Sequence, residues 1–176
     1  MNFVKIDENS KSLEYLGFME RKVYGFESNT NISYEESQIL EEILNSEIYF
    51  ETDKVIEYQK GEKSKKYYTR VNGPITDSIL LSDFIKLSYH GLKETVREFE
   101  KESDWGEDLP IFNKLFSDTA KWIEENEYYQ DSIYFVNADV LEKDKVIEFN
   151  FFTYFISLII ISITKSKVVI INHGGD

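Results

Sequence analysis

The chain has 176 residues, no cysteine, and 33 acidic against 20 basic side chains, which gives a formal net charge of -13. The missing cysteine excludes disulfides, thiolate zinc sites and cysteine nucleophiles, and the negative charge opposes direct binding to nucleic acid or to an anionic membrane surface. With 41% hydrophobic and 15% aromatic residues and no linker or repeat, the chain is expected to fold alone as a single domain, residues 1–176.

The apolar stretches of the chain bear on its location. Met1 to Glu8 lacks the apolar core and the small-residue cleavage site of a signal peptide. The most apolar run, Phe151 to Ile163, has 13 residues, fewer than the roughly 20 that a helix needs to cross a bilayer. We therefore expect a cytoplasmic protein that has no membrane partner.

The N-terminal part of the chain predicts a strand, a helix and a loop. Met1 to Ile6 alternates apolar and polar side chains, as a half-buried strand does, and Leu13, Leu16 and Met19 recur at helical spacing. Gly25 to Asn31 has the polar composition that is typical of a loop.

A further helix is expected to begin near Ser33. Ser33 to Glu36 has the Ser-x-x-Glu spacing of a capping box, which satisfies free backbone amides at a helix start. Apolar side chains follow at three- and four-residue spacing, and acids occupy the other side of the helix. The apolar set is Ile39, Leu40, Ile43 and Leu44.

Short runs rich in β-branched and aromatic residues predict strands in the next stretch. These runs are Glu47 to Glu51, Lys54 to Gln59 and Lys66 to Val71. Lys60 to Lys65 is turn material between the last two runs, so we expect a β-hairpin extended into a meander. Asn72 to Pro74 is expected to end it.

The middle of the chain predicts helices. Thr76 and Asp77 can cap a helix start. The apolar positions that follow at helical spacing are Leu80, Leu81, Phe84, Ile85 and Leu87, and then Leu92, Val96 and Phe99. Gly91 is therefore either a weak point within one helix or a break between two.

Another helix and two strands follow. Pro110 stands at a first-turn position, and the apolar face of the helix that it opens comprises Phe112, Leu115, Phe116, Trp122 and Ile123. Ser132 to Val136 and Lys145 to Phe149 predict strands, and Asp139 to Asp144 predicts the loop between them.

The C-terminal region predicts a buried helix and a final strand. Thr153, Ser157 and Thr164 form a narrow polar stripe along the apolar run from Phe151 to Ile163, which favours a central core helix over a strand. Val168 to Ile171 predicts a last buried strand. The expected fold class is α+β: a single domain with a mixed or antiparallel sheet from two hairpin regions and four to six helices packed beside it.

Residues that could serve catalysis or metal binding are few. Only His90 and His173 could titrate near neutral pH by default, and neither has a metal-binding spacing such as His-Glu-x-x-His. His173 to Gly175 is similar to the His-Gly-Gly oxyanion turn of some esterases, but the chain has no Gly-x-Ser-x-Gly elbow. We therefore predict no catalytic residue, no metal site and no cofactor.

Two acidic segments that carry aromatic residues are the predicted partner-binding surface. The first, Glu98 to Asp108, places Trp105 among carboxylates, and the second, Glu124 to Asp131, lies near the first if the intervening helix packs back. Tryptophan is enriched at binding hot spots and carboxylates steer a basic partner; the alternative is that Trp105 packs in the core. The predicted binding residues are Glu102, Asp104, Trp105, Glu107, Asp108, Glu124, Glu125, Glu127, Tyr128, Tyr129 and Asp131.

In size and composition the chain resembles the immunity proteins of bacterial contact-dependent or polymorphic toxins, which are compact, acidic and free of cysteine. No motif carries this resemblance, so it assigns no residue. It implies a cytoplasmic, non-enzymatic protein that neutralises a toxin domain, such as a basic nuclease, by occluding its active site. Two alternatives stay open: a phage or mobile-element inhibitor of a host defence protein, and a small hydrolase that uses a carboxylate with His90 or His173.

Overall fold

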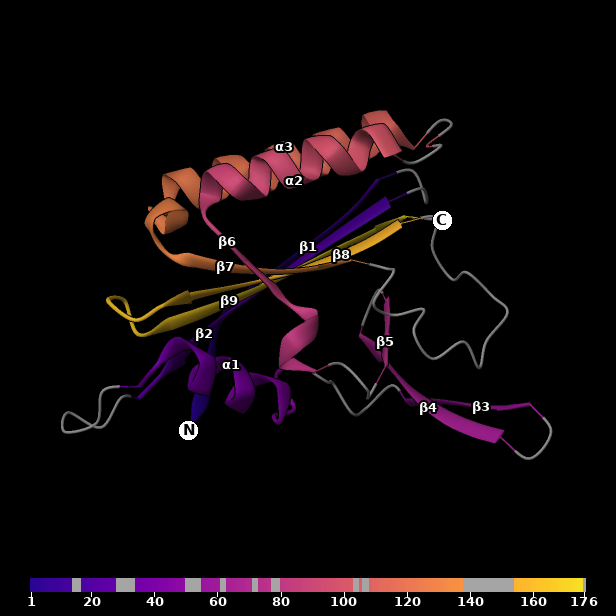
Figure 1. The fold of residues 1–176 in the computed structure, drawn as a ribbon, viewed down its shortest axis with the longest axis horizontal. Coiled ribbons are helices and arrows are strands. Elements are labelled where there is room, and N and C mark those ends of the chain that lie inside the picture. Colours follow the sequence, from indigo (N-terminus) through magenta and orange to yellow (C-terminus); the bar gives the residue numbers. More distant parts are fainter. Residues whose placement is uncertain are drawn as a thin grey trace.

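The computed structural model describes residues 1–13, 17–27, 34–49, 55–60, 63–70, 73–76, 80–102, 105, 108–137 and 154–175, with the backbone alone for the three segments between 55 and 76. Six strands form one sheet: β1 (Phe3–Leu13), β2 (Gly17–Phe26), β6 (Ile85–Leu87), β7 (Ser132–Asn137), β8 (Tyr154–Ser162) and β9 (Lys167–Gly175). Their order is β1-β2-β9-β8-β7-β6, and every neighbouring pair is antiparallel (Figure 1). The pairing of β2 with β9 joins the N-terminal and C-terminal parts of the chain within one sheet.

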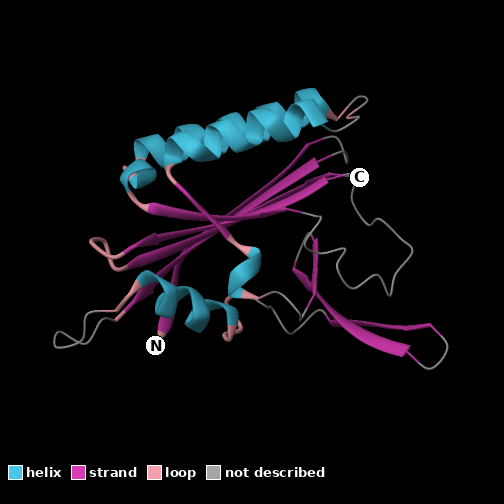
Figure 2. Ribbon diagram, viewed as in Figure 1, coloured by secondary structure: helices cyan, strands magenta, loops and turns pink. Residues whose placement is uncertain are grey.

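Helices cover both faces of this sheet. α2 (Tyr89–Glu102) and α3 (Leu109–Glu125) lie side by side on one face, and α1 (Glu36–Leu44) lies on the other (Figure 1, Figure 2). Two short 3-10 turns, η2 (Leu81–Asp83) and η3 (Tyr128–Gln130), precede β6 and β7. The described residues around the six-stranded sheet therefore form three layers, with the sheet in the middle.

α1 packs through the apolar stripe that the sequence predicts. The four residues of that stripe are all buried, and they belong to one hydrophobic cluster with side chains of β2, β7, β8 and β9. At the start of the helix the Gln38 side chain accepts a hydrogen bond from the Glu35 amide at 3.0 Å. The side chain thus satisfies a backbone amide that has no partner within the helix.

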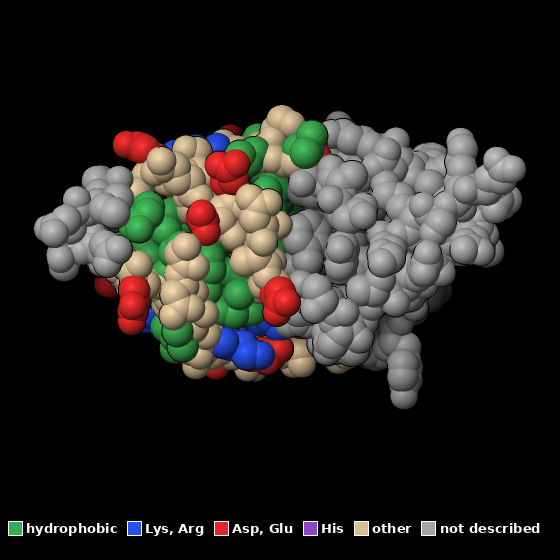
Figure 3. Space-filling model, turned by 90° about the horizontal axis from the view of Figure 1, so that it is seen from below, with side chains coloured by type: hydrophobic (Ala, Val, Ile, Leu, Met, Phe, Trp, Pro, Cys, Tyr) green, Lys and Arg blue, Asp and Glu red, His purple; other side chains and the backbone are tan. Residues whose placement is uncertain are grey.

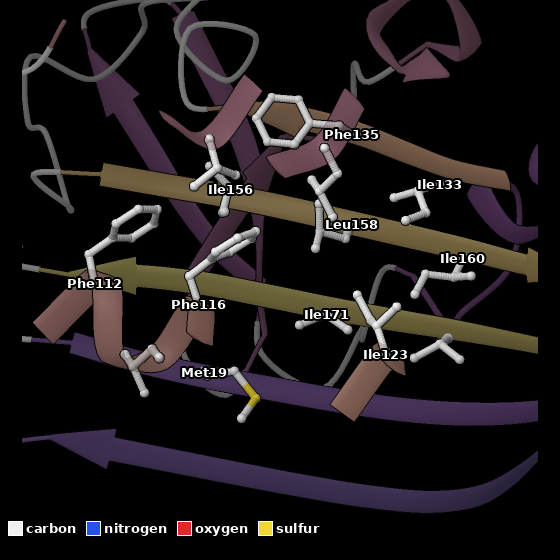
Figure 4. Packing of buried hydrophobic residues seen from close by; sticks show 14 of the residues in the cluster. Met19, Phe112, Phe116, Ile123, Ile133, Phe135, Ile156, Leu158, Ile160 and Ile171 are labelled. Carbon is white, nitrogen blue, oxygen red and sulfur yellow. The ribbon is translucent and has the colours of Figure 1, made fainter. Parts of the chain in front are cut away.

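The central strands are buried on both faces because helices lie above and below them. Every residue of β8 is buried, and successive side chains of a strand point to opposite faces. On β9, the residues that face α1 are Val168, Ile170 and Asn172, and those that face α3 are Val169, Ile171 and His173. Figure 4 shows the α3-facing cluster, in which Phe112, Phe116 and Ile123 of α3 lie over Ile156, Leu158 and Ile160 of β8.

α3 lies close against the sheet at Gly17, the first residue of β2. A Cβ atom at this position would lie 2.8 Å from Cγ2 of Ile111 and 3.3 Å from Cδ1 of Leu115. Carbon atoms in normal contact are about 3.5–4.0 Å apart. The absence of a side chain at Gly17 is therefore what lets the first turns of α3 lie against β2.

A second, smaller sheet has three antiparallel strands, β3 (Val55–Lys60), β4 (Lys63–Arg70) and β5 (Gly73–Thr76), in the order β3-β4-β5. The predicted hairpin of Lys54 to Gln59 with Lys66 to Val71 corresponds to β3 and β4, although β4 begins at Lys63, within the predicted turn. The meander does not end at Asn72 to Pro74, because Gly73 and Pro74 pair with Arg70 and Thr69 of β4.

The predicted number of helices is wrong. Within the described residues there are three α-helices, not four to six. One sheet was expected to combine both hairpin regions, but β3 and β4 lie in a separate sheet from the six antiparallel strands. The largest error is the core helix expected at Phe151 to Ile163, where the structure has β8. A strand buried on both faces shows no apolar–polar alternation, so its sequence pattern cannot be told from that of a buried helix.

Three shorter predictions are also wrong. The helical spacing of Leu13, Leu16 and Met19 falls on a strand pair, since β1 ends at Leu13 and β2 contains Met19. Glu47 to Tyr49 forms turns after α1 where a strand was expected, and residues 81–87 form η2 and β6 where a helix was expected. The loop predicted at Asp139 to Asp144 and the strand predicted at Lys145 to Phe149 lie outside the described residues.

Candidate partner-binding surface

α2 and α3 form an antiparallel pair, because the start of α2 contacts the end of α3. The Tyr89 hydroxyl donates to the Ala120 carbonyl at 3.2 Å and to Oε1 of Glu124 at 2.7 Å. At the other end, the rings of Phe99 and Phe112 lie 6.0 Å apart. Both predicted acidic segments flank this pair, one at each end of α3.

The first segment turns its tryptophan inward. Trp105 is 5% exposed, stacks on Phe112 with ring centroids 4.7 Å apart, and lies 5.0 Å from the ring of Tyr154. Its indole Nε1 has no hydrogen-bond partner among the described residues. The sequence left open whether Trp105 lies at a binding surface or packs in the core, and in the structure its ring packs in the core.

The acids of the first segment are only partly described. Asp108 is 8% exposed and stands at the N-cap of α3, and its backbone amide donates to the Trp105 carbonyl at 2.8 Å. Glu102 is the last residue of α2, and nothing of its side chain is described. Asp104 and Glu107 lie outside the described residues. In the described part of this segment, Glu98 of α2 is exposed and Glu100 is partly buried, whereas Asp108 beside Trp105 is buried.

The second segment forms the end of α3 and is mostly exposed. We call Glu124, Glu125, Glu127, Tyr128, Tyr129 and Asp131 the C-terminal pole of α3. Its three glutamates are exposed, and the ring of Tyr129 is 42% exposed. Asp131 is partly buried, which raises its pKa, although a hydrogen bond with Ser162 acts in the opposite sense. The pole thus places an aromatic ring among carboxylates that solvent can reach.

Two of the glutamates already have cationic neighbours. Glu124 accepts hydrogen bonds from Tyr89 and, at 3.1 Å, from Nζ of Lys93, and these two contacts lower its pKa. Glu125 lies 3.6 Å from Nζ of Lys121, one helical turn earlier. For the carboxylate of Glu127 the structure records no hydrogen bond or ion pair with any described residue.

Glu127 also has an unfavourable backbone. It follows the C-cap of α3 with φ 56° and ψ 33°, in the left-handed region. This position after a helix is usually glycine, because a Cβ atom makes the left-handed conformation costly. The pole therefore holds a glutamate where the backbone alone would favour glycine.

Stacked aromatic rings and two cationic side chains pack against the backbone of the pole. Tyr128 is 3% exposed and stacks on Trp122 at 5.3 Å, and the guanidinium of Arg21 lies 4.1 Å from the Trp122 ring. On the other side, Nζ of Lys165 lies 4.4 Å from the Tyr128 ring. The same Nζ donates to the carbonyls of Asn126 and Glu127 at 2.6 and 3.0 Å. A cation on each side of the two rings thus fixes the backbone from which the exposed glutamates project.

The two acidic segments do not meet. α3 has 17 residues, and at a rise of 1.5 Å per residue they span about 25 Å between the two segments. On the α1 side of the molecule, acidic side chains are scattered among basic, apolar and other groups (Figure 3). The C-terminal pole is therefore the best defined exposed acidic cluster in the part of the chain whose side chains are described.

The two histidines occupy opposite environments, and neither lies in a reactive cluster of described residues. The His90 side chain is 81% exposed and lies 3.2 Å from Oε1 of Glu94. His173 is fully buried, and its Nε2 lies 2.9 Å from Oγ1 of Thr119. Burial lowers the pKa of His173 to about 3, so the ring is neutral at any physiological pH.

A group of buried polar residues was missed as a unit by sequence reasoning. Glu20, Asn172 and Ser157 stand directly opposite one another on β2, β9 and β8. Asn172 donates to Glu20 at 3.3 Å, Ser157 donates to Asn172 at 2.7 Å, and the Tyr49 hydroxyl donates to Ser157 at 3.3 Å. Nζ of Lys22 lies 3.0 Å from Oε1 of Glu20. We call these five residues the polar row.

The polar row has a structural rather than a reactive arrangement. Each of its side chains is at most 2% exposed, and its polar atoms bond to one another. Buried networks of this kind fix strand register because a shift by one residue would leave charges without partners. The signal in the sequence is that Glu20 and Lys22 carry opposite charges two residues apart in a strand, which places them on the same face.

None of the helices in the described part of the chain combines the length and the apolar character needed to cross a bilayer. Among the same residues, no three histidine or carboxylate side chains lie together in a way that could hold a metal ion. Comparisons with family models, with curated proteins and with solved structures found no match for this chain.

Proposed function

We propose that the chain is a non-enzymatic binding protein that captures a basic protein partner through the C-terminal pole of α3. One observation carries this proposal: the pole keeps carboxylates where folding alone disfavours them. Glu124 and Glu125 stand in the last turn of α3, where the helix dipole already presents negative charge. Glu127 adopts a left-handed backbone, which costs a residue with a side chain about 1–2 kcal/mol relative to the right-handed form.

The three carboxylates differ in how many hydrogen bonds and ion pairs they form within the monomer. This difference supports a role in binding a cationic side chain of a partner. Glu124 is tied to Tyr89 and Lys93, whereas Glu125 has one contact at 3.6 Å. The carboxylate of Glu127 has no hydrogen bond or ion pair with any described residue. A lysine or arginine from a partner would supply the missing contacts, and Tyr129 offers an apolar ring beside them.

In this proposal the partner is a toxin domain, such as a basic nuclease, and the protein acts as an immunity protein. A nuclease binds its substrate through lysine and arginine side chains that contact phosphates. Carboxylates at the pole are complementary to such a groove in charge, so the bound protein would occlude the active site. The net charge of -13 would also speed the encounter between the two proteins.

The test is charge reversal at the pole, measured against a basic toxin domain that the wild-type chain neutralises. The double variant Glu125→Lys/Glu127→Lys is expected to lose at least about tenfold in affinity by calorimetry, because each reversal sets like charges against the partner. Glu41→Lys/Glu47→Lys is the matched control, since it changes the net charge equally at exposed positions on α1 and in the turn after it. Equal losses in both variants, or a loss in neither, would exclude the pole as the binding surface.

A second readout separates neutralisation from mere binding. Cells that express the toxin domain are expected to grow when they also express the wild-type chain or the α1 control. They are expected to stop growing with the pole variant. Growth with the pole variant would show that neutralisation uses another surface.

A further inference from the structure

β1 forms one edge of the six-stranded sheet and lies almost bare on both faces. Eight of its 11 residues are exposed, whereas β2, its only neighbour in the described sheet, has no exposed residue. The exposed set includes the apolar side chains of Val4 and Ile6, each 56% exposed. The helical layers therefore end at β2, and β1 extends beyond them.

The opposite edge of the sheet is different. β6 has three residues, Ile85–Leu87, and a short edge strand offers few unpaired backbone groups. A long exposed edge is a template for pairing with another strand, which proteins avoid unless the pairing is used. β1 carries Lys5 and Lys11, which deter random pairing, but it also carries Asp7 and Glu8. Its two positive and two negative charges sum to zero.

We propose that β1 pairs with β1 of a second copy, antiparallel and about a two-fold axis at Asn9. The two sheets then become one continuous sheet, with six strands from each copy. The pairing uses no residue of the C-terminal pole, so it is independent of the proposed partner.

The backbone limits where the axis can fall. Residues that stand opposite each other in an antiparallel pair share a face, so a two-fold axis normal to the sheet passes between two copies of the same residue. β1 is in regular register with β2 from Asp7 to Leu13, and its register shifts between Lys5 and Asp7. The regular edge that is free to pair therefore begins at Asp7.

The charges on this regular edge select one register. An axis at Glu8 would set Glu8 against itself, and an axis at Lys11 would set Lys11 against itself. An axis at Ser10 would leave Asp7 opposite Leu13, with no opposed charges. An axis at Asn9 sets Asp7 against Lys11 of the second copy, and it does so twice. Opposite charges across a strand pair are stabilising and like charges are destabilising.

The contacts within one copy extend this complementarity. Asp7 lies 3.8 Å from the guanidinium of Arg21 on β2, and Lys11 is hydrogen-bonded to Asp118 on α3. Pairing at Asn9 would therefore build a row of charges that alternate in sign: Arg21 and Asp7 of one copy, then Lys11 and Asp118 of the other. The net negative charge of each copy opposes association, but that repulsion is screened beyond about 8 Å at physiological salt, whereas the paired charges are in contact.

Single cysteine variants test the register, because the chain has no cysteine of its own. Opposite residues in an antiparallel pair have Cα atoms about 4.5–5.5 Å apart, which suits a disulfide. Asn9→Cys is therefore expected to form a disulfide-linked dimer under mild oxidation. Asp7→Cys alone and Lys11→Cys alone are expected to form no disulfide. In either dimer the two cysteines lie four residues, about 14 Å, apart along the paired strands.

A mixture of the two charged-site variants is the decisive arm. Asp7→Cys mixed with Lys11→Cys is expected to form the cross-linked heterodimer, with the second Asp7–Lys11 contact intact. Sedimentation of the cysteine-free chain is expected to show a mass that doubles with rising concentration. The proposal is overturned if that chain stays monomeric and Asn9→Cys cross-links no faster than Glu94→Cys on α2. It is equally overturned if all single variants cross-link alike.

Discussion

The two faces of the six-stranded sheet bury polar groups in opposite ways. On the α1 side, the polar row links Glu20, Asn172 and Ser157 across three strands, so each group has a partner. On the α3 side, Nε1 of Trp105, the hydroxyl of Tyr154 and Nδ1 of His173 are buried without a hydrogen bond to any described residue. The same sheet thus holds a connected network on one face and single, unsatisfied groups on the other.

Because of this difference, we expect the effect of a substitution on stability to depend on whether the buried group is hydrogen-bonded rather than on how deeply it is buried. Removing one member of a bonded network leaves its partner buried and unsatisfied, which costs about 1–3 kcal/mol, or more for a charged group. Removing a group that has no partner relieves a desolvation cost that folding has already incurred. Stability should therefore fall steeply for changes on the α1 side and little for matched changes on the α3 side.

The largest effect is expected at the buried ion pair of the polar row. Lys22→Met leaves the carboxylate of Glu20, which is 2% exposed, with Asn172 as its one remaining partner among the described residues, so we expect a loss of about 3–5 kcal/mol in the free energy of unfolding. The double variant Glu20→Leu/Lys22→Met is expected to recover most of that loss, because it leaves no unpaired charge. Urea unfolding of both variants measures this, and an equal loss in the two would contradict the ion-pair account.

The next effect is a pH dependence that belongs to the α3 side. Burial lowers the pKa of His173 to about 3, whereas a histidine in the unfolded chain titrates near 6.5. The unfolded state therefore binds one proton more as pH falls below about 6.5. The stability that the neutral ring contributes is complete above that pH and is lost progressively down to about pH 3.

Comparison with a variant isolates this contribution. Between pH 6.5 and pH 5, the stability advantage of the wild type over His173→Gln is expected to shrink by about 2 kcal/mol, at roughly 1.4 kcal/mol per pH unit. His90→Gln, at an exposed histidine, serves as the control and is expected to unfold in parallel with the wild type. A constant difference between the wild type and His173→Gln across this range would rule out a neutral buried ring.

A smaller effect distinguishes two buried tyrosines. Tyr49→Phe removes the hydroxyl that donates to Ser157 and is expected to cost about 1 kcal/mol. Tyr154→Phe removes a hydroxyl that no described residue bonds and is expected to leave the unfolding free energy unchanged or slightly raised. Both values come from denaturant unfolding. If Tyr154→Phe were the more damaging of the two, the contrast between the faces would not hold.

Sequence patterns predicted the correct type of element where one side of that element is exposed to solvent. α1 and α3 were predicted because acids and lysines mark their wet faces, and the hairpin of β3 and β4 because Gly61 and charged residues separate its strands. β8 was mistaken for a helix because both of its faces are covered. Its sequence therefore lacks the alternation of apolar and polar side chains that marks a half-exposed strand. Local pattern fails where burial is complete.

The candidate surface was predictable in composition but not in geometry. The acids of Glu124 to Asp131 are evident in the sequence, whereas the stack beneath them joins Arg21 of β2, Trp122 of α3 and Lys165 of the turn before β9. Contacts between residues so distant along the chain follow from strand order. The left-handed backbone of Glu127 follows from the path that the chain takes from α3 into η3.

The measurement that most directly tests the account is the stability and affinity of Glu127→Gly. Glycine relieves the positive φ, so this variant is expected to unfold at higher urea than the wild type, by about 1 kcal/mol, while it binds the toxin domain less tightly. Ser166→Gly is the matched control, because Ser166 is the other described non-glycine residue with positive φ; it is expected to gain stability and keep its affinity. A Glu127→Gly variant that is less stable than the wild type, or that binds equally well, would contradict the claim that the pole is kept for a partner.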